Sequence, residues 1–386
     1  MSDLQLLFLV LAALYGWECA AWLRRGSVAF TTWLSRSWRA QPPGALLGNQ
    51  RGGFIFAAPL PPLGTLLMAN PFPLSLSPEA ALAFVATNVN PGWRANQTGR
   101  WLALDALREV RADGKKLVVN GEVWFVAPSA SYARFVAGKV LQVAKLRPPK
   151  REKAIRELVA ASLDTKAVEN RWQEYRRPAQ GLQWLSNALV VYVFAVVPAV
   201  VWFVGVRLSG LGVLVGLLAL TIAAAALFRR AHRALYPGAE DECFTHTLTI
   251  ALSPANAMRA HDALSRPLLE DFHPLAVAKV LLSEVAFQNL ARSVLLDLRN
   301  PALPWCPAND AAARGAEAFS RQVLREAIES FLKQSGVEPD GLCRAPKPAD
   351  ETCRAFCPRC HAQFTAVGGT CTDCGGLALV AFSSPA

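Results

Sequence analysis

The sequence lacks the short motifs that identify several common enzyme classes. It contains no Walker phosphate-binding loop, no Gly-x-Ser-x-Gly nucleophile motif and no His-Glu-x-x-His zinc motif. It also has no Gly-x-Gly-x-x-Gly motif after a predicted strand, which a dinucleotide-binding fold would need. The chain therefore offers no motif for these chemistries, and we favour a protein that is not an enzyme.

Charged residues are also scarce. They make up 18% of the 386 residues, against about 25% in typical soluble domains, while hydrophobic residues make up 53%. The mean hydropathy is +0.24, and the apolar excess is concentrated in three blocks. Each block is long enough to cross a bilayer as a helix. We therefore predict a membrane protein with three transmembrane α-helices, at residues 1–23, 182–206 and 211–228.

The first block, Leu4–Leu23, contains one charged residue, Glu18. A cleaved signal peptide would begin with basic residues, but only Asp3 precedes the block, and no lipobox precedes Cys19. We therefore expect a retained membrane helix. An acid inside a membrane is a candidate functional group, although Glu18 lies close enough to Arg24 to reach the interface by snorkelling.

Basic residues predict the orientation of the three helices. Arg24 and Arg25 follow the first block, and the short turn at 207–210 between the other two carries a single basic residue. The outer ends of that pair are basic as well, through Arg176, Arg177, Arg229, Arg230 and Arg233. The positive-inside rule then predicts a multi-pass protein of the bacterial inner (plasma) membrane, with its N-terminus outside and its C-terminus in the cytoplasm.

Three residues inside the second and third blocks indicate how their helices pack. Pro198 should kink the second span, because proline removes a backbone donor. Gly212 and Gly216 put two small residues on one face of the third span, which suits close helix packing, although glycine is common in such helices by chance.

The net positive charge lies in the segment after the first block. Residues 24–181 carry 23 Lys or Arg against 10 Asp or Glu, whereas residues 229–386 carry 16 against 17. The densest part, residues 139–156, has seven basic residues and one acid. It is either a solvated face or a contact with anionic lipid headgroups. We do not expect nucleic acid as a partner, because no aromatic-and-basic recognition motif accompanies the charge.

Residues 24–181 are predicted to form a basic cytoplasmic α+β domain. The Asn120-Gly121 pair is a strong hairpin signal between two β-rich runs, and a helix capped by Ser129 or Ser131 should follow. Proline-rich residues 53–76 indicate short strands and turns, and Ser77-Pro78-Glu79 indicates the start of a helix through 80–87. The strands are expected at Val110–Ala112, Lys116–Val119 and Glu122–Val126.

Residues 229–342 are predicted to form a mainly helical cytoplasmic region, followed by a linker at 343–354. Alternation of threonine with aliphatic residues predicts a strand at Thr245–Leu252. Helices are expected from Ser253 through Leu264, over Pro274–Leu298 and over Ala311–Gln334.

Four cysteines near the C-terminus form the most specific pattern in the chain. Cys357-Pro-Arg-Cys360 is followed after ten residues by Cys371-Thr-Asp-Cys374. Each pair places two sulfurs on one side of a tetrahedral metal, so the spacing predicts a structural zinc site with four thiolate ligands. A redox dithiol is the alternative, but it would need only one such pair at the start of a helix.

This pattern resembles a zinc ribbon or a rubredoxin-like knuckle pair over about residues 355–382. Pro358 in the first hook and Gly375 after the second are shared with that family, whereas His361 stands where the family often has glycine. The resemblance implies a small β-rich module at 355–386 that binds nucleic acid or protein, or is purely structural. No family is recognised over the whole chain.

The remaining cysteines and histidines carry weaker signals. Cys343 and Cys353 are either alternative ligands or free thiols. His261-Asp262 and the Asp271 to His273 segment could form an oxygen and nitrogen metal site, but no metal-binding spacing supports one.

These features favour a non-enzymatic membrane anchor, scaffold or assembly partner. It would contact the lipid bilayer and either a protein partner or further copies of itself. One alternative is a component of a membrane-associated enzyme or transport complex that uses Glu18 or the region of His261 and His273. Another is a membrane-tethered nucleic-acid-binding protein.

Overall fold

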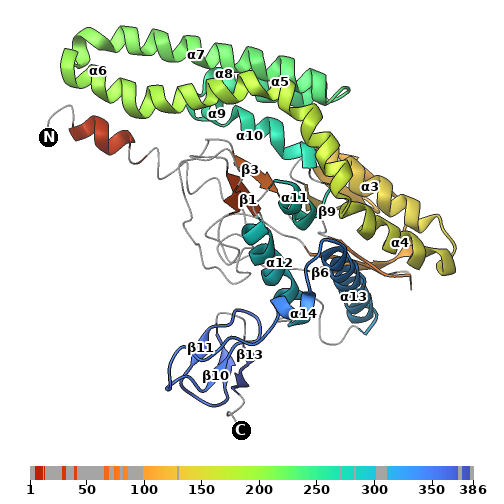
Figure 1. Cartoon of the computed structure of the whole chain (residues 1–386). Helices are drawn as coiled ribbons and strands as arrows, with labels where there is room; N and C mark the ends of the chain where they lie inside the picture. Colours follow the sequence, from red (N-terminus) through yellow and green to blue (C-terminus); the bar gives the residue numbers. More distant parts are fainter. Residues whose placement is uncertain are drawn as a thin grey trace.

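A computed structural model describes most of the chain after residue 98, together with short pieces before it. It contains two candidate membrane-spanning helices, further helical regions and several small sheets (Figure 1). The described residues are 5–11, 13, 28–31, 39–40, 65–68, 74–78, 81–85, 99–127, 130–269, 271–281, 284–300, 311–372 and 376–382.

A long helical hairpin projects from the rest of the molecule (Figure 1). Its first arm is one helical run of 40 residues, and its second arm, α7, returns beside it. The chain reverses at Gly205, whose φ of +82° favours glycine. The turn predicted at 207–210 is therefore wrong, because those residues already belong to α7. The arms comprise α5 (Thr165–Val191), the π-helical turn η2 (Tyr192–Val196), α6 (Val197–Val204) and α7 (Val206–Leu235).

Two helices in the described part of the chain are long and apolar enough to cross a membrane. They are Thr165–Val204 and Gly210–Leu235, with mean hydropathies of 2.3 and 2.6 over their most apolar stretches. Only 22% of each stretch is buried, so most of its apolar surface is not covered by other parts of the described chain. Of the predicted first span, residues 5–11 and 13 are helical and Leu11 packs against the main core. Glu18 and the rest lie outside the described residues.

Irregular backbone accompanies the proline predicted to kink the second span. The π-helical turn at Tyr192–Val196 ends two residues before Pro198, where the ring removes one backbone donor. Within this turn, the Tyr192 hydroxyl donates a hydrogen bond of 3.0 Å to the carbonyl of Val213 on α7. Gly216 lies beneath the same hydroxyl, and an added Cβ there would collide with it. Gly212 has open space.

Three helices fold back along the base of the hairpin. The strand predicted at Thr245–Leu252 is wrong, since those residues belong to α8, which packs against α7. Ser253 caps the next helix as predicted, with its hydroxyl accepting from the N–H of Asn256 at 3.4 Å. That helix ends at Met258 instead of continuing to Leu264. The three are α8 (Glu240–Leu252), α9 (Pro254–Met258) and α10 (Ala260–Ser265).

The predicted hairpin around Asn120-Gly121 is confirmed. Both residues have positive φ, and the Asn120 side chain holds the turn. Its Oδ1 accepts from the N–H groups of Arg108 and Glu109 at 2.8 and 3.1 Å, while its Nδ2 donates to Ala106 at 3.0 Å. The antiparallel sheet comprises β7 (Val110–Asp113), β8 (Lys116–Val119) and β9 (Glu122–Val126), and α3 (Ala130–Ala144) packs against it.

The helix predicted over 80–87 is wrong. Residues Ala81–Val85 form β5, the middle strand of an antiparallel sheet, with Leu82 opposite Leu76 on one side and Leu102 on the other. Pairing on both edges overrides the local helix signal. The other strands in this part are β4 (Leu74–Leu76), β6 (Gly99–Ala103), β1 (Val28–Thr31), β2 (Arg39–Ala40) and β3 (Thr65–Met68).

The remaining helices bring together the chain segments that precede and follow the hairpin in the sequence. The predicted helix over Ala311–Gln334 is confirmed as α13, whereas Pro274–Leu298 forms two helices. Val323 of α13 is buried in the core of the β7–β9 sheet, and Glu326 pairs with Arg156 at 2.6 Å. Each of the two large hydrophobic clusters among the described residues therefore contains side chains from both 24–181 and 229–342. These helices are α4 (Pro148–Ser162), α11 (Pro274–Leu281), α12 (Glu284–Arg299), α13 and α14 (Pro339–Leu342).

The substitution Gly216→Ala tests the hairpin contact. We expect it to lower stability by about 1–3 kcal/mol, because the new methyl group must displace the Tyr192 hydroxyl. The control Gly212→Ala should be neutral or stabilising, because its Cβ meets no atom and alanine favours helix. Thermal unfolding of both variants in detergent measures the difference, and equal melting temperatures would contradict the contact.

Candidate metal centre

The C-terminal module consists of very short antiparallel strands. Each predicted cysteine hook is a connection between two paired strands, so the hairpins hold the hooks in place. The first hook joins β10 to β11, and the second begins in β12 and leads to β13. The strands are β10 (Ala355–Phe356), β11 (Gln363–Phe364), β12 (Thr370–Cys371), β13 (Leu377–Ala378) and β14 (Val380–Ala381).

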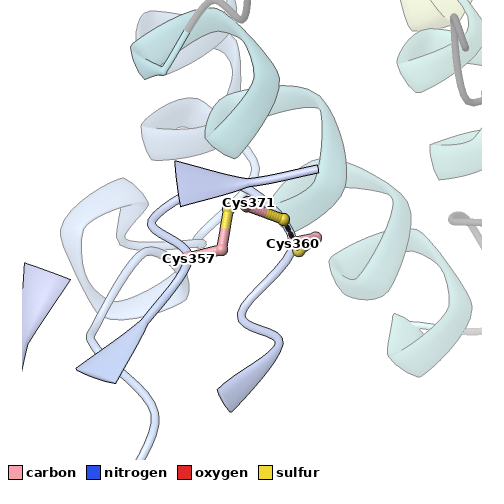
Figure 2. Close-up of side chains that lie close together, drawn as sticks. All are labelled: Cys357, Cys360 and Cys371. Carbon is pink, nitrogen blue, oxygen red and sulfur yellow. Dashed lines mark hydrogen bonds between the residues drawn. The ribbon is translucent and has the colours of Figure 1, made fainter. Parts of the chain in front are cut away.

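Three of the four predicted ligands come together. The sulfurs of Cys357, Cys360 and Cys371 all lie within 4.8 Å of one another (Figure 2). No other group of three potential ligands of this kind occurs among the residues that the structure describes. Cys374, the fourth predicted ligand, lies outside them. The three cysteines could hold a metal ion.

The spacing of the sulfurs fits metal thiolates. Cys360 and Cys371 have an Sγ to Sγ distance of 3.8 Å. Metal–sulfur bonds of about 2.3 Å in a tetrahedron place neighbouring sulfurs about 3.8 Å apart, whereas a disulfide needs about 2.05 Å. Cys357 and Cys371 are buried and Cys360 is exposed, so the cluster opens to solvent on one side.

Backbone hydrogen bonds shape both hooks. The N–H of His361 donates to the carbonyl of Cys357 at 2.9 Å, and the N–H of Gly376 donates to the carbonyl of Cys371 at 2.8 Å. Each of these donors has a positive φ, of +59° for His361 and +75° for Gly376. This explains why the resembling family often has glycine at the position of His361: the turn needs a left-handed residue.

Side-chain contacts hold His361 in that conformation. Its Nδ1 hydrogen-bonds with Nη2 of Arg292 on α12, and its ring meets the ring of Phe356 edge-on at 5.8 Å. Burial lowers the pKa of His361, and the charge of Arg292 lowers it further. The imidazole is therefore neutral at neutral pH and can accept the bond from the guanidinium.

The first hook is anchored to the helical body. Besides Arg292, the amide of Asn300 at the end of α12 donates to the carbonyl of Pro358 at 3.0 Å. The preceding linker is held by Gln363, which accepts from the N–H of Ala349 at 2.8 Å and donates to the carbonyl of Lys347 at 2.9 Å. The sequence pattern around the hook does not indicate Arg292 or Asn300, because nothing local marks residues about 60 positions upstream as its neighbours.

The other described cysteines stand apart from this cluster. Cys343 and Cys353 are free thiols and do not belong to the three-sulfur group. Burial raises the pKa of the Cys343 thiol, which disfavours the thiolate that a metal requires. Cys243 is buried against α7. Cys19 and Cys306 lie outside the described residues.

The two candidate histidines are core residues. His261 is buried and its Nε2 lies 2.8 Å from the Tyr175 hydroxyl of α5, while Nδ1 of His273 accepts from the N–H of Leu275 at 3.2 Å. Burial lowers the pKa of His261 to about 4 and that of His273 to about 3, so both are neutral at physiological pH. Neither joins a group of three potential ligands in the described part of the chain.

Comparison with protein-family models, with curated proteins and with solved structures finds no match for this chain. The candidate site therefore rests on its own geometry.

Metal analysis of single variants tests the cluster. We expect the purified protein to carry about one thiophilic metal ion per chain, and Cys357→Ser or Cys371→Ser to lose most of it because a buried thiolate is removed. Elemental mass spectrometry of the purified proteins provides the measurement.

Cys343→Ser is the matched control, since this free thiol lies outside the cluster, and it should retain the metal. Equal metal content in the wild type and all three variants would refute the site.

Proposed function

We propose that this chain is a non-enzymatic inner-membrane protein that anchors an assembly surface in the cytoplasm. The observation that carries the proposal is an exposed apolar hairpin joined directly to a folded body with a cysteine cluster at its far end (Figure 1). The hairpin places both flanking segments on one side of a membrane. The cysteine cluster of the body supports a binding role, because a closed site of thiolate ligands is typical of structural metal sites.

Tryptophan placement supports the membrane contact. Trp184 and Trp202 are both exposed and lie 18 residues apart on the first arm. At about 1.5 Å per residue this separation is about 27 Å, close to a hydrocarbon thickness of about 30 Å. Tryptophan favours both interfaces of a bilayer. The hairpin therefore spans the membrane with Gly205 at the far surface.

The orientation follows from the basic residues at the open end of the hairpin. Arg229, Arg230 and Arg233 are exposed where α7 leaves the apolar stretch, and Arg176 and Arg177 lie at the same end of α5. The body is then cytoplasmic. With the first block as a third span, the N-terminus is outside.

The cysteine module is proposed to be a structural zinc ribbon. Cys374 would supply the fourth thiolate, because it holds the place in the β12–β13 connection that Cys360 holds in the β10–β11 connection. Four thiolates leave no position for water, so the metal would support binding and not catalysis. The cytoplasm keeps such thiols reduced.

A protein partner or another copy of the chain is the proposed ligand of the assembly surface. Anionic lipid is a further ligand through residues 139–156. Three of the seven basic residues there have acidic partners, namely Arg151, Lys153 and Arg156, so lipid contact would fall to the other four. Nucleic acid is not proposed as a ligand.

Reporter fusions test the orientation. A fluorescent protein that matures only in the cytoplasm, fused to the C-terminus, should be bright, and an extracytoplasmic phosphatase inserted after Gly205 should be active. Both outcomes follow if the hairpin crosses the membrane and returns. A dark C-terminal fusion with an inactive phosphatase at Gly205 would contradict this topology.

Quantitative affinity capture tests the assembly role. The full-length protein, extracted in mild detergent, should retain specific proteins or further copies of itself, and Cys371→Ser should lose them because its module unfolds. Cys343→Ser is the matched control and should behave as the wild type. A protein that remains solitary after gentle extraction and chemical cross-linking would contradict the scaffold role.

A further inference from the structure

Helix α8 exposes an apolar face beside the hairpin. Phe244, Leu248 and Leu252 follow one another at four-residue spacing, and their exposed fractions are 69%, 48% and 76%. The opposite face carries Cys243 and Ile250, which are buried in the structure. Because the helix already buries one apolar face, this second stripe has no partner within the described part of the chain.

The threonines of α8 add to its apolar character. The hydroxyls of Thr245, Thr247 and Thr249 donate to carbonyls of the same helix, of Asp241, Cys243 and His246, at 2.9, 2.6 and 2.9 Å. Such internal bonds satisfy the hydroxyl donors without water. Thr245 and Thr249 are exposed next to the stripe. Their hydroxyl groups already donate hydrogen bonds within the helix and do not require water as an acceptor.

Contacts with the hairpin define the position of α8 relative to the proposed membrane surface. The rings of Phe228 and His246 lie 5.9 Å apart, and farther along the chain the carbonyl of Ala257 in α9 accepts from the Ser186 hydroxyl at 3.4 Å. Ser186 is two residues from Trp184, which marks the inner interface in the proposed function. The C-terminal end of α8 therefore lies at the membrane surface, and its start lies farther into the cytoplasm.

The charges around α8 match a headgroup layer. Arg229, Arg230 and Arg233 are exposed on the adjacent turns of α7, where guanidinium groups can meet lipid phosphates. The exposed acids Glu240 and Asp241 lie at the end of α8 away from the membrane. Glu242 accepts from the N–H of Ala130 at 2.8 Å and so fixes that end to α3.

We propose that α8 contacts the inner leaflet of an anionic bilayer through Phe244, Leu248 and Leu252, with Leu252 the deepest of the three and Phe244 the nearest to the cytoplasm. The inference rests on the membrane hairpin of the proposed function and adds a lipid contact next to it. Apolar side chains at the headgroup boundary and arginines beside them are the usual elements of a membrane-surface contact. The contact would also fix the tilt of the cytoplasmic body relative to the membrane.

Site-directed spin labelling tests the proposal. A nitroxide is attached to p-acetylphenylalanine, placed singly at Phe244, Leu248 or Leu252 of the full-length protein, so that the native cysteines need no change. The protein is reconstituted in vesicles of phosphatidylethanolamine and phosphatidylglycerol. The measurement compares collision of the label with oxygen, which concentrates in lipid, and with a water-soluble nickel complex.

Two matched sites calibrate the result. Leu214 is exposed on α7 and should report lipid, whereas Val285 is an exposed apolar residue on α12, remote from the hairpin, and should report water. We expect the accessibility ratio at the α8 sites to shift from the value at Val285 towards that at Leu214, most strongly at Leu252.

Each other outcome overturns the inference in a distinct way. If Leu214 reports lipid while the α8 sites match Val285, the helix is in water and only this inference fails. If the α8 labels are shielded from both reagents, a protein covers the stripe instead of lipid. If Leu214 itself reports water, the membrane hairpin of the proposed function fails as well.

Discussion

The continuous helix of α5, η2 and α6 is the element on which the rest of the structure depends. Its lower half packs into the main core through Tyr175, Leu182 and Leu189, which are almost completely buried. Its upper half is largely exposed and apolar. Because one continuous helix belongs to both regions, the orientation of the hairpin determines the orientation of the folded body.

The folded body is assembled from the chain segments that precede and follow the hairpin in the sequence. Val323 of α13 fills the core beneath the β7–β9 sheet, and Arg299 links α12 to Glu329 of α13 and Asp340 of α14 at 2.8 Å each. The C-terminal cysteine module contacts the end of α12 through Arg292 and Asn300. A chain of contacts therefore leads from the two candidate membrane-spanning helices to the cysteine cluster.

Sequence patterns predicted the elements whose signals are local. The Asn120-Gly121 hairpin and the helix over Ala311–Gln334 are confirmed, and three of the four predicted metal ligands converge. The strand predicted at Thr245–Leu252 failed because its threonine hydroxyls bond to their own helix and its buried side chains face α7. The helix predicted over 80–87 failed because pairing with strands on both sides decides that segment.

The sequence by itself determined the apolar hairpin, its basic ends and the spacing of the cysteine hooks, because each depends on residues close together in the chain. Only the tertiary structure decided which surfaces face outward on α8, that His261 is a buried partner of Tyr175 and that Arg292 holds His361. Those features depend on contacts between residues from 69 to 86 positions apart or on what each helix face meets. Short-range periodicity carries no information about such contacts.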